Sequence, residues 1–355
     1  MHDVLVVGAG PAGSHAARRC AELGLDVLML DAATFPRDKA CGGVVGEEAV
    51  RLVGRDVLSV VEREGRGNEI FFDWRPLAWI PSPHMYFFKR RKFDHCLVKK
   101  AVAAGAVLLE GRRVTRVAVE PDRVVVEANG ERHEARLVIG ADGTNSVVGR
   151  AVGLSHHDGT WKFASIKAEV DLPPDRMEAL GVENPMPHQR TYFFSDLLGF
   201  AWVIPNEGSV NAGFGAMMRH AAGLRQRFYG FLAGLGVPPQ DVRGAQIPYL
   251  PLPRVYGDRV LLTGDAGGFV NPWTGCGIDD GIRASERAAR VARLAVDRGD
   301  FTASTLREFQ RASRDHLRWI DRRGRWMKAL DLLIPPGSKV PSFFRHLVRV
   351  GAAWA

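Results

Sequence analysis

The fold is determined by residues 4–13, Val4-Leu5-Val6-Val7-Gly8-Ala9-Gly10-Pro11-Ala12-Gly13. Four consecutive apolar residues predict a short strand buried on both faces of a parallel sheet. The glycine turn that follows opens into a helical pattern from Ser14 to Leu23. In such a turn Gly8 permits the tight bend, Gly10 lets a pyrophosphate approach the backbone, and Gly13 lets helix and strand pack closely. The segment therefore predicts a Rossmann-like dinucleotide-binding turn.

The second predicted strand, residues 26–30, ends at Asp31. A carboxylate at this distance from the glycine turn is suited to bind ribose hydroxyls. The helix N-terminus adds free N–H groups and a partial positive charge for the pyrophosphate. Asp31 favours FAD or NAD over NADP, whose ribose carries a 2′-phosphate. The candidate residues here are Gly8, Gly10, Ala12, Gly13 and Asp31.

Two further apolar strands end in a glycine and an aspartate. The first leads into Gly140-Ala141-Asp142-Gly143, and the second into Thr263-Gly264-Asp265. Aspartates at the carboxyl ends of parallel strands point into the ligand crevice. With the first turn, these motifs resemble, in the same order, those of flavoprotein oxidoreductases with the p-hydroxybenzoate hydroxylase fold.

That resemblance implies FAD and a set of residues around it. Asp265 would bind the ribityl chain, and Asp142 with Gly143 would border the pyrophosphate groove. Gly275, Gly277 and Ile278 would place a helix N-terminus at the flavin ring. Two more positions match that fold: Arg90 corresponds to the arginine of its R-x-x-F-D segment, and Val114 to the residue whose backbone meets the adenine.

No second glycine turn of this kind is present. The reductant is therefore expected to be NAD(P)H that docks transiently, or another electron carrier, including an electron-carrier protein.

Two segments narrow the family. They are Phe35-Pro36-Arg37-Asp38-Lys39-Ala40-Cys41-Gly42-Gly43, which includes the candidate Gly42, and Gly199-Phe200-Ala201-Trp202-Val203-Ile204-Pro205. Both are similar to motifs of the geranylgeranyl reductase family, P-x-x-K-x-C-G-G and W-x-F-P. Ile204 departs from the family's phenylalanine, and Cys276 replaces an acid that commonly follows Thr-Gly. The second segment also resembles the G-W-x-W-x-I-P of flavin halogenases, which leaves an oxygen-using relative open.

Three residues are candidates for catalysis. Cys41 lies between basic residues and two glycines, a setting that favours an acidic thiol or a proton donor near the flavin. Cys276 lies at the predicted helix start, where the helix dipole favours a thiolate. Trp202, on an alternating strand, either packs in the core or lines an apolar substrate channel.

The net charge of +8 is concentrated near the C-terminus. From Leu306 onward there are 11 basic and 4 acidic residues, so the rest of the chain is nearly neutral and nucleic acid is not an expected partner. Leu306, Phe309, Leu317 and Ile320 recur at helical spacing among the arginines. Such a helix either contacts an anionic membrane surface or packs on the FAD-binding domain. The 4 dispersed cysteines fit a reducing compartment and indicate no metal site, so we expect a cytoplasmic protein, with peripheral membrane contact left open.

The expected fold class is α/β. A Rossmann-like FAD-binding domain with a parallel sheet comprises residues 1–75, 90–155 and 255–300. A mixed or antiparallel sheet, the substrate domain, comprises residues 76–89 and 156–254, and a basic helical tail comprises residues 301–355.

The resemblance favours an FAD-dependent reductase that saturates isolated C=C bonds of an apolar, prenyl (geranylgeranyl-type) substrate. The alternative is a flavin-dependent monooxygenase or halogenase acting on an aromatic group, because one fold serves several reactions. An electron-transfer flavoprotein that passes electrons to a quinone or a protein is a third hypothesis.

Overall fold

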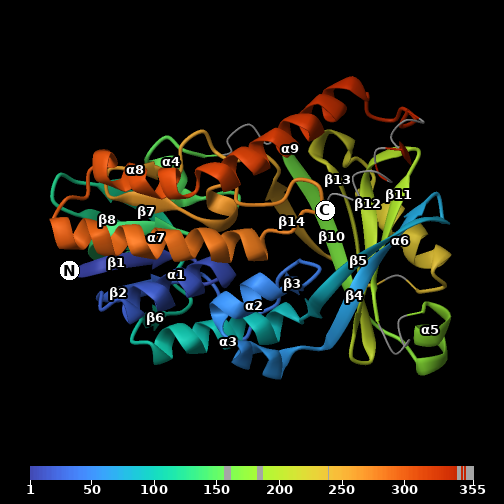
Figure 1. Ribbon diagram of the computed structural model, residues 1–355, viewed down its shortest axis with the longest axis horizontal. Helices are drawn as coiled ribbons and strands as arrows, with labels where there is room; N and C mark the ends of the chain where they lie inside the picture. The colour runs from blue at the N-terminus through green and yellow to red at the C-terminus, as the bar shows by residue number, and fades with distance from the viewer. Residues whose placement is uncertain (156–160, 182–186, 239, 342–344, 347, 349–355) are drawn as a thin grey trace.

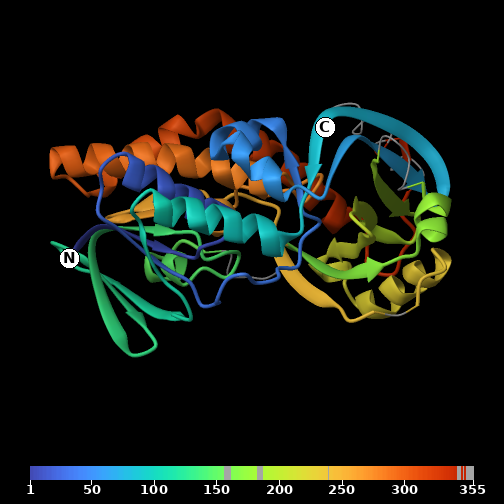
Figure 2. The same cartoon turned by 90° about the horizontal axis from the view of Figure 1, so that it is seen from below.

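The computed structural model describes residues 1–355 except 156–160, 182–186, 239, 342–344, 347 and 349–355. Within the described residues, two sheets of eight strands each form the two halves of an elongated molecule (Figures 1 and 2). The first sheet lies in the half that contains the N-terminus, and the second lies at the opposite end (Figure 1).

The first sheet has a parallel centre in the order β16-β9-β1-β2-β6. Strands β15, β7 and β8 extend it in antiparallel pairings. Its strands are β1 (His2–Val7), β2 (Val27–Leu30), β6 (Val107–Leu109), β7 (Val114–Val119), β8 (Val124–Ala128), β9 (Glu131–Gly140), β15 (Tyr256–Gly257) and β16 (Val260–Leu262). The residues of β1 from Val4 to Val7 are buried, as a strand covered on both faces requires.

Helices flank this sheet. They are α1 (Pro11–Glu22), α3 (Arg90–Ala103), α4 (Val147–Ala151) and α7 (Ile278–Arg298). Helix α7 packs along α1, and Figure 1 shows the two side by side. A smaller cluster joins α2 (Glu47–Val53) and the short 3-10 turn Arg55–Val60 to α3.

The second sheet runs in the order β14-β10-β13-β12-β11-β4-β5-β3 and is antiparallel except for the parallel pair of β11 and β4. Its strands are β3 (Val44–Gly46), β4 (Arg63–Phe72), β5 (Arg75–Phe87), β10 (Lys162–Asp171), β11 (Gln189–Phe194), β12 (Leu197–Asn206), β13 (Ser209–Met217) and β14 (Arg243–Pro248). Helices α5 (Pro174–Ala179) and α6 (Leu224–Gly234) cover one face, where Tyr192 and Phe214 pack against Phe231. The other face borders a cavity, and Leu330 and Ile334 at the end of the chain's last long helix also pack on it.

These sheets confirm the predicted fold class, an α/β FAD-binding domain with a mixed second sheet and C-terminal helices. One expected boundary differs from the structure. Strands β3 and β4 belong to the second sheet, although the sequence placed residues 1–75 in the FAD-binding domain. Their partners lie far along the chain, because β4 pairs with β11 at residues 189–193, and local sequence does not show such a pairing.

The tail forms α8 (Ala303–Ala312) and α9 (Arg314–Leu333). Leu306, Phe309 and Ile320 are fully buried and Leu317 nearly so, which makes these four residues core contacts rather than lipid contacts. Helix α9 runs from the first half toward the second (Figure 1). In the described part of the chain, no helix is long and apolar enough to cross a membrane.

Candidate functional site

The glycine turn has the geometry that its sequence predicts. Gly8 has a φ of +95°, and a Cβ there would lie 2.4 Å from the carbonyl oxygen of Ala141. A Cβ on Gly13 would lie 1.7 Å from the carbonyl oxygen of Gly8. In contrast, a Cβ on Gly10 would meet only the Arg37 guanidinium, at 3.8 Å. Gly8 and Gly13 therefore make the turn compact, while Gly10 leaves its open side to a ligand.

The small side chain of Ala12 lets three segments of the chain lie close to one another. Its side chain would contact a Cβ on Gly264 at 2.9 Å and a Cβ on Gly281 at 3.2 Å. Small residues at these positions let the first turn of α1 lie against the end of β16 and the first turns of α7. The Gly-Asp motif at Asp265 is thereby brought beside the glycine turn.

The Asp31 carboxylate closes the turn on its other side. Its Oδ2 accepts a hydrogen bond from the Ala9 N–H at 2.7 Å, and its Oδ1 accepts one from the Ala33 N–H at 2.7 Å. These bonds fix the carboxylate at the wall of the cavity and leave lone pairs for a ligand hydroxyl.

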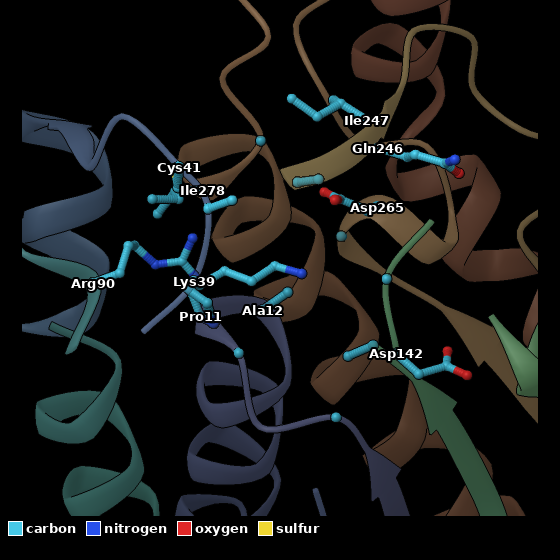
Figure 3. Close-up of a pocket in the computed structure, with 18 of the residues that line it drawn as sticks. Pro11, Ala12, Lys39, Cys41, Arg90, Asp142, Gln246, Ile247, Asp265 and Ile278 are labelled. Carbon is cyan, nitrogen blue, oxygen red and sulfur yellow. The ribbon is translucent and has the colours of Figure 1, made fainter. Parts of the chain in front are cut away.

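A cavity of about 530 Å³ lies between the two sheets and joins nearly all of the predicted site residues. Figure 3 shows Lys39 and Arg90 reaching into it from one side and Asp265 from the other. Only Gly13 lies behind the wall, in keeping with its packing role. The lining includes Gly8, Gly10, Ala12, Asp31, Cys41, Gly42, Arg90, Val114, Asp142, Gly143, Trp202, Asp265, Gly275, Cys276, Gly277 and Ile278.

The two aspartates of the later motifs have different environments. Asp142 accepts hydrogen bonds from the Ser146 hydroxyl at 2.6 Å and from the Val147 N–H at 2.6 Å, so it caps α4. Burial raises the pKa of Asp265, and the nearby Lys39 and Arg90 partly offset that increase. Asp142 thus orders the groove edge, while Asp265 presents its carboxylate to the cavity (Figure 3).

Arg90 is held by a buried carboxylate. Its Nε and Nη2 donate to the two oxygens of Asp94, each at 2.7 Å, and Arg37 donates to the same carboxylate at 2.8 Å. Burial opposes the charge of Arg90, but Asp94 and then Cys41 outweigh it, so the pKa of Arg90 lies above its ordinary value. Asp94 thereby fixes two arginines at the cavity wall. Arg90 was predicted from a motif, whereas no role was predicted for Arg37, which lies 57 residues from Asp94 in the sequence.

The loop before α7 places a helix N-terminus in the cavity, as expected. Gly275 has a φ of +68° and its N–H bonds to the Asn271 carbonyl at 2.9 Å, while the Asn271 N–H bonds to the Cys276 carbonyl at 2.9 Å. The thiolate expected at Cys276 stays a prediction, and the local environment opposes it. Although the side chain faces the open cavity, the surrounding protein raises the pKa of the Cys276 thiol to about 12, and desolvation outweighs any effect of the helix dipole.

Trp202 connects the second sheet to the loop that carries Cys41. Its indole N–H donates to Asn211 Oδ1 at 2.9 Å, and Asn211 Nδ2 donates to the Cys41 carbonyl at 3.0 Å. The indole lies across Gly213, where a Cβ would come within 1.9 Å of the ring. Trp202 is therefore buried in the core and also lines the large cavity, while its predicted lining of a substrate channel stays a prediction.

A second cavity of about 120 Å³ continues from the first along the face of the second sheet opposite α5 and α6, where Met327 and Val348 also line it. The two share Phe163, Gln189, Phe200, Ile247, Thr274 and Gly275, so we call them the large lobe and the small lobe of one site. No charged side chain of the described residues lines the small lobe. Most of these residues were not predicted from the sequence, although the alternation of Phe200, Trp202 and Ile204 along β12 indicates which of its side chains share a face.

The residues present fit FAD. The glycine turn leaves room only at Gly10, Asp31 is fixed beside it, and the first turn of α7 reaches the other end of the same cavity. A ligand with a pyrophosphate between an adenosine and a second ring system matches this order of groups.

Comparison with known proteins agrees with this geometry. Residues 1–208 match the family model described as an FAD binding domain. The structure is similar to the geranylgeranyl bacteriochlorophyll reductase-like protein of Thermoplasma acidophilum, with a TM-score of 0.78, 23% identity and coverage of 99% of this chain and 96% of that one. It also resembles the halogenase PltM solved with FAD, at 19% identity and a TM-score of 0.71, over 87% of this chain and 73% of that one. The fold and site therefore define an FAD-dependent oxidoreductase with the p-hydroxybenzoate hydroxylase-type fold.

Sequence relatives define the family within that class. Digeranylgeranylglycerophospholipid reductase 2 of Methanopyrus kandleri is 33% identical over 87% of this chain and 81% of its own length. Menaquinone reductase of Mycobacterium tuberculosis is 33% identical over 81% of this chain and 76% of its own. The chain belongs to the geranylgeranyl reductase family of FAD-dependent oxidoreductases. Because these relatives are named as reductases, the comparison favours the predicted reductase activity over the monooxygenase or halogenase alternative.

Proposed function

We propose that this protein saturates isolated C=C bonds of a prenyl substrate bound in the small lobe. The observation that carries the proposal is the shared wall between the lobes: Phe200, Ile247 and Gly275 border both the predicted flavin end and an uncharged, mostly apolar recess. A prenyl chain in that recess would lie against the flavin end of the large lobe. Apolar walls suit such a chain because its burial is driven by the area removed from water.

Saturation of a C=C bond adds a hydride equivalent to one carbon and a proton to the other. FAD, once reduced, supplies the hydride equivalent. We assign the proton to the Cys41 thiol, whose sulfur accepts a hydrogen bond from the Gly43 N–H at 3.4 Å and whose side chain lines the large lobe. Water entering the cavity would return the proton to the thiolate. Cys276 stays a protonated thiol on the opposite loop and is the second candidate donor.

In this proposal Trp202 is a positioning residue that does not itself react. Its hydrogen bond to Asn211, and the bond from Asn211 to the Cys41 carbonyl, hold the Cys41 loop against the second sheet. The indole also forms part of the wall that excludes water from the reacting bond.

The reductant is proposed to be NAD(P)H or another electron carrier that docks transiently. Contact with a membrane is proposed at the end of α9. Trp326, Leu332 and Leu333 are exposed there by 60%, 57% and 75%, beside the exposed Arg325. Their neighbour Met327 lines the small lobe, so this surface adjoins the substrate recess. Exposed apolar side chains next to basic ones suit an anionic lipid surface.

The test is a single turnover without oxygen. Protein with bound FAD is reduced and mixed with a prenylated naphthoquinone or a prenylated glycerophospholipid, and the products are analysed by mass spectrometry. We expect a product with two added hydrogens and reoxidation of the flavin in step with it. A flavin that stays reduced until air is admitted, with oxygen then found in the product, would overturn the proposal in favour of the monooxygenase class.

A further inference from the structure

Uncharged polar side chains interrupt the apolar wall of the small lobe. Besides Tyr249, Asn271 and Thr274, three of them lie together on two paired strands. They are Asn68 on β4, and Gln189 and Thr191 on β11. The Thr191 hydroxyl donates to Asn68 Oδ1 at 3.0 Å and accepts from Gln189 Nε2 at 3.0 Å. We call these residues the amide-hydroxyl trio.

Strand register places the trio next to the reactive end of the site. Gln189 is paired with Asn68 across β11 and β4, and Thr191 is paired with Trp202 across β11 and β12. Paired residues on one face have Cβ atoms roughly 5 Å apart. Gln189 also borders both lobes. The trio therefore lies beside the wall formed by Trp202, rather than at a distant end of the recess.

Some donors and acceptors of the trio have no hydrogen-bond partner among the described residues. Thr191 is satisfied by its two partners, but the Asn68 amide N–H groups and the Gln189 amide oxygen have no partner among the described residues. Thr191 is buried, and its two bonds hold both amides in place. The cavity wall thus offers one amide donor and one amide acceptor. Polar groups in an apolar cavity are costly unless a ligand or water pairs with them.

The charge of the lining limits what can bind there. No lysine, arginine or histidine of the described residues borders the small lobe, so a phosphate would be left without a counter-charge. A neutral oxygen function, in contrast, matches an amide donor and an amide acceptor.

We propose that the amide-hydroxyl trio binds the neutral carbonyl or hydroxyl oxygen of the substrate's head group, and that a prenylated quinone is preferred over a prenylated phospholipid. This inference rests on the proposed function for the identity of the chain that fills the recess.

The test measures binding to the oxidised protein with FAD bound, by titration calorimetry. One ligand is a naphthoquinone with a short prenyl chain, and the other is a naphthalene with the same chain and no oxygen. We expect Asn68→Leu to weaken quinone binding by about tenfold, the effect of one lost hydrogen bond, and to change hydrocarbon binding by less than about twofold. Thr191→Val should weaken quinone binding by a smaller factor, again without a matching effect on hydrocarbon binding. Thr191→Ser, which keeps the hydroxyl, should bind the quinone as wild type does.

Equal losses for both ligands would show a merely structural role and would overturn the inference, as would unchanged quinone binding in Asn68→Leu. The flavin absorbance of each variant checks that it is folded. The two proposals fail separately. Single turnover that saturates prenyl bonds, without ligand-selective effects of the variants, contradicts only the trio assignment. Selective quinone binding without any saturation contradicts only the proposed function.

Discussion

The pKa of a side chain in this site depends more on burial than on the residues next to it in the sequence. Cys276 shows this most clearly, because it lies just before a helix N-terminus, where a lowered thiol pKa is the ordinary expectation. The structure instead raises its pKa to about 12. Desolvation by the surrounding protein weakens the solvation on which a thiolate depends.

This pKa gives a reactivity prediction. Alkylation of Cys276 by iodoacetamide should be slow at neutral pH and should rise about tenfold per pH unit through pH 10, since only the thiolate reacts. Peptide mapping by mass spectrometry resolves Cys276 from Cys41 and Cys96. The buried Cys20, whose pKa is also raised to about 12, serves as the unreactive control. A rate that levels off below pH 9 would identify Cys276 as a thiolate site.

Among the helices, the contact between α1 and α7 supports the glycine turn. Glu286 on α7 bonds to His15 at 3.2 Å and pairs with Arg19 at 2.9 Å, both of them on α1. Burial lowers the pKa of His15, and the hydrogen bond and charge of Glu286 partly offset that decrease. That bond outweighs the burial of Glu286 and, together with Arg19, lowers the pKa of the carboxyl to about 2.

Glu286 therefore contributes stability that depends on pH. Its pKa is lower in the folded protein than in the unfolded chain, so the contribution is present above pH 4.5 and is lost as the pH falls toward 2. Glu286→Gln should reduce the free energy of unfolding by about 2 kcal/mol at neutral pH, and the gap to wild type should narrow below pH 4.5.

Urea unfolding across this pH range measures the effect. Glu308→Gln, which removes a carboxylate paired with Arg311 within α8, is the control and should change little. A gap between wild type and Glu286→Gln that stays constant down to pH 3 would contradict the assignment.

Elements with local signatures were predictable from sequence, and elements defined by distant pairing were not. The strand, turn and helix from Val4 to Glu22 follow from the glycine spacing and apolar run, and the structure confirms them. Strand β4 pairs with β11, which lies far along the chain, so the domain boundary expected at residue 75 did not include this pairing. The ion pair of Arg37 with Asp94 also joins distant residues, so no role was predicted for Arg37. Trp202 was found because its strand carries a family motif, whereas Asn68 and Gln189 lie in segments without one.

The whole molecule brings a cofactor-binding half and an apolar sheet face together around one cavity. Helix α9 extends from one half toward the other (Figure 1). Its amphipathic pattern allowed two interpretations, because a sequence does not show whether protein or lipid covers an apolar face. The buried Leu317 and Ile320 show that protein covers the apolar face in the first turns. In the last turns Leu330 is also buried, and the exposed Trp326 and Leu333 belong to the surface for which membrane contact is proposed.

Vesicle binding tests that assignment. The double variant Trp326→Ser, Leu333→Ser should bind vesicles rich in phosphatidylglycerol at least about fivefold more weakly than wild type, because it removes most of the exposed apolar contact. Trp79→Ser, which removes a tryptophan of similar exposure on β5, is the matched control. Equal binding by the double variant and wild type would exclude the end of α9 as the contact.

The most direct test of the central claim, that the small lobe holds the prenyl group being reduced, is to fill that lobe and measure single-turnover saturation without oxygen. Ile80, a partly buried residue of its wall, is replaced by tryptophan, with Ile80→Ala as the control. Retained flavin absorbance shows that each variant is folded, and Met327→Trp on the opposite element repeats the test if Ile80→Trp loses its flavin. We predict that the filled variant keeps FAD and loses prenyl saturation by at least about tenfold, since the chain can no longer enter, while Ile80→Ala stays near the wild-type rate. Saturation at the wild-type rate in a flavin-loaded, filled variant would contradict the account.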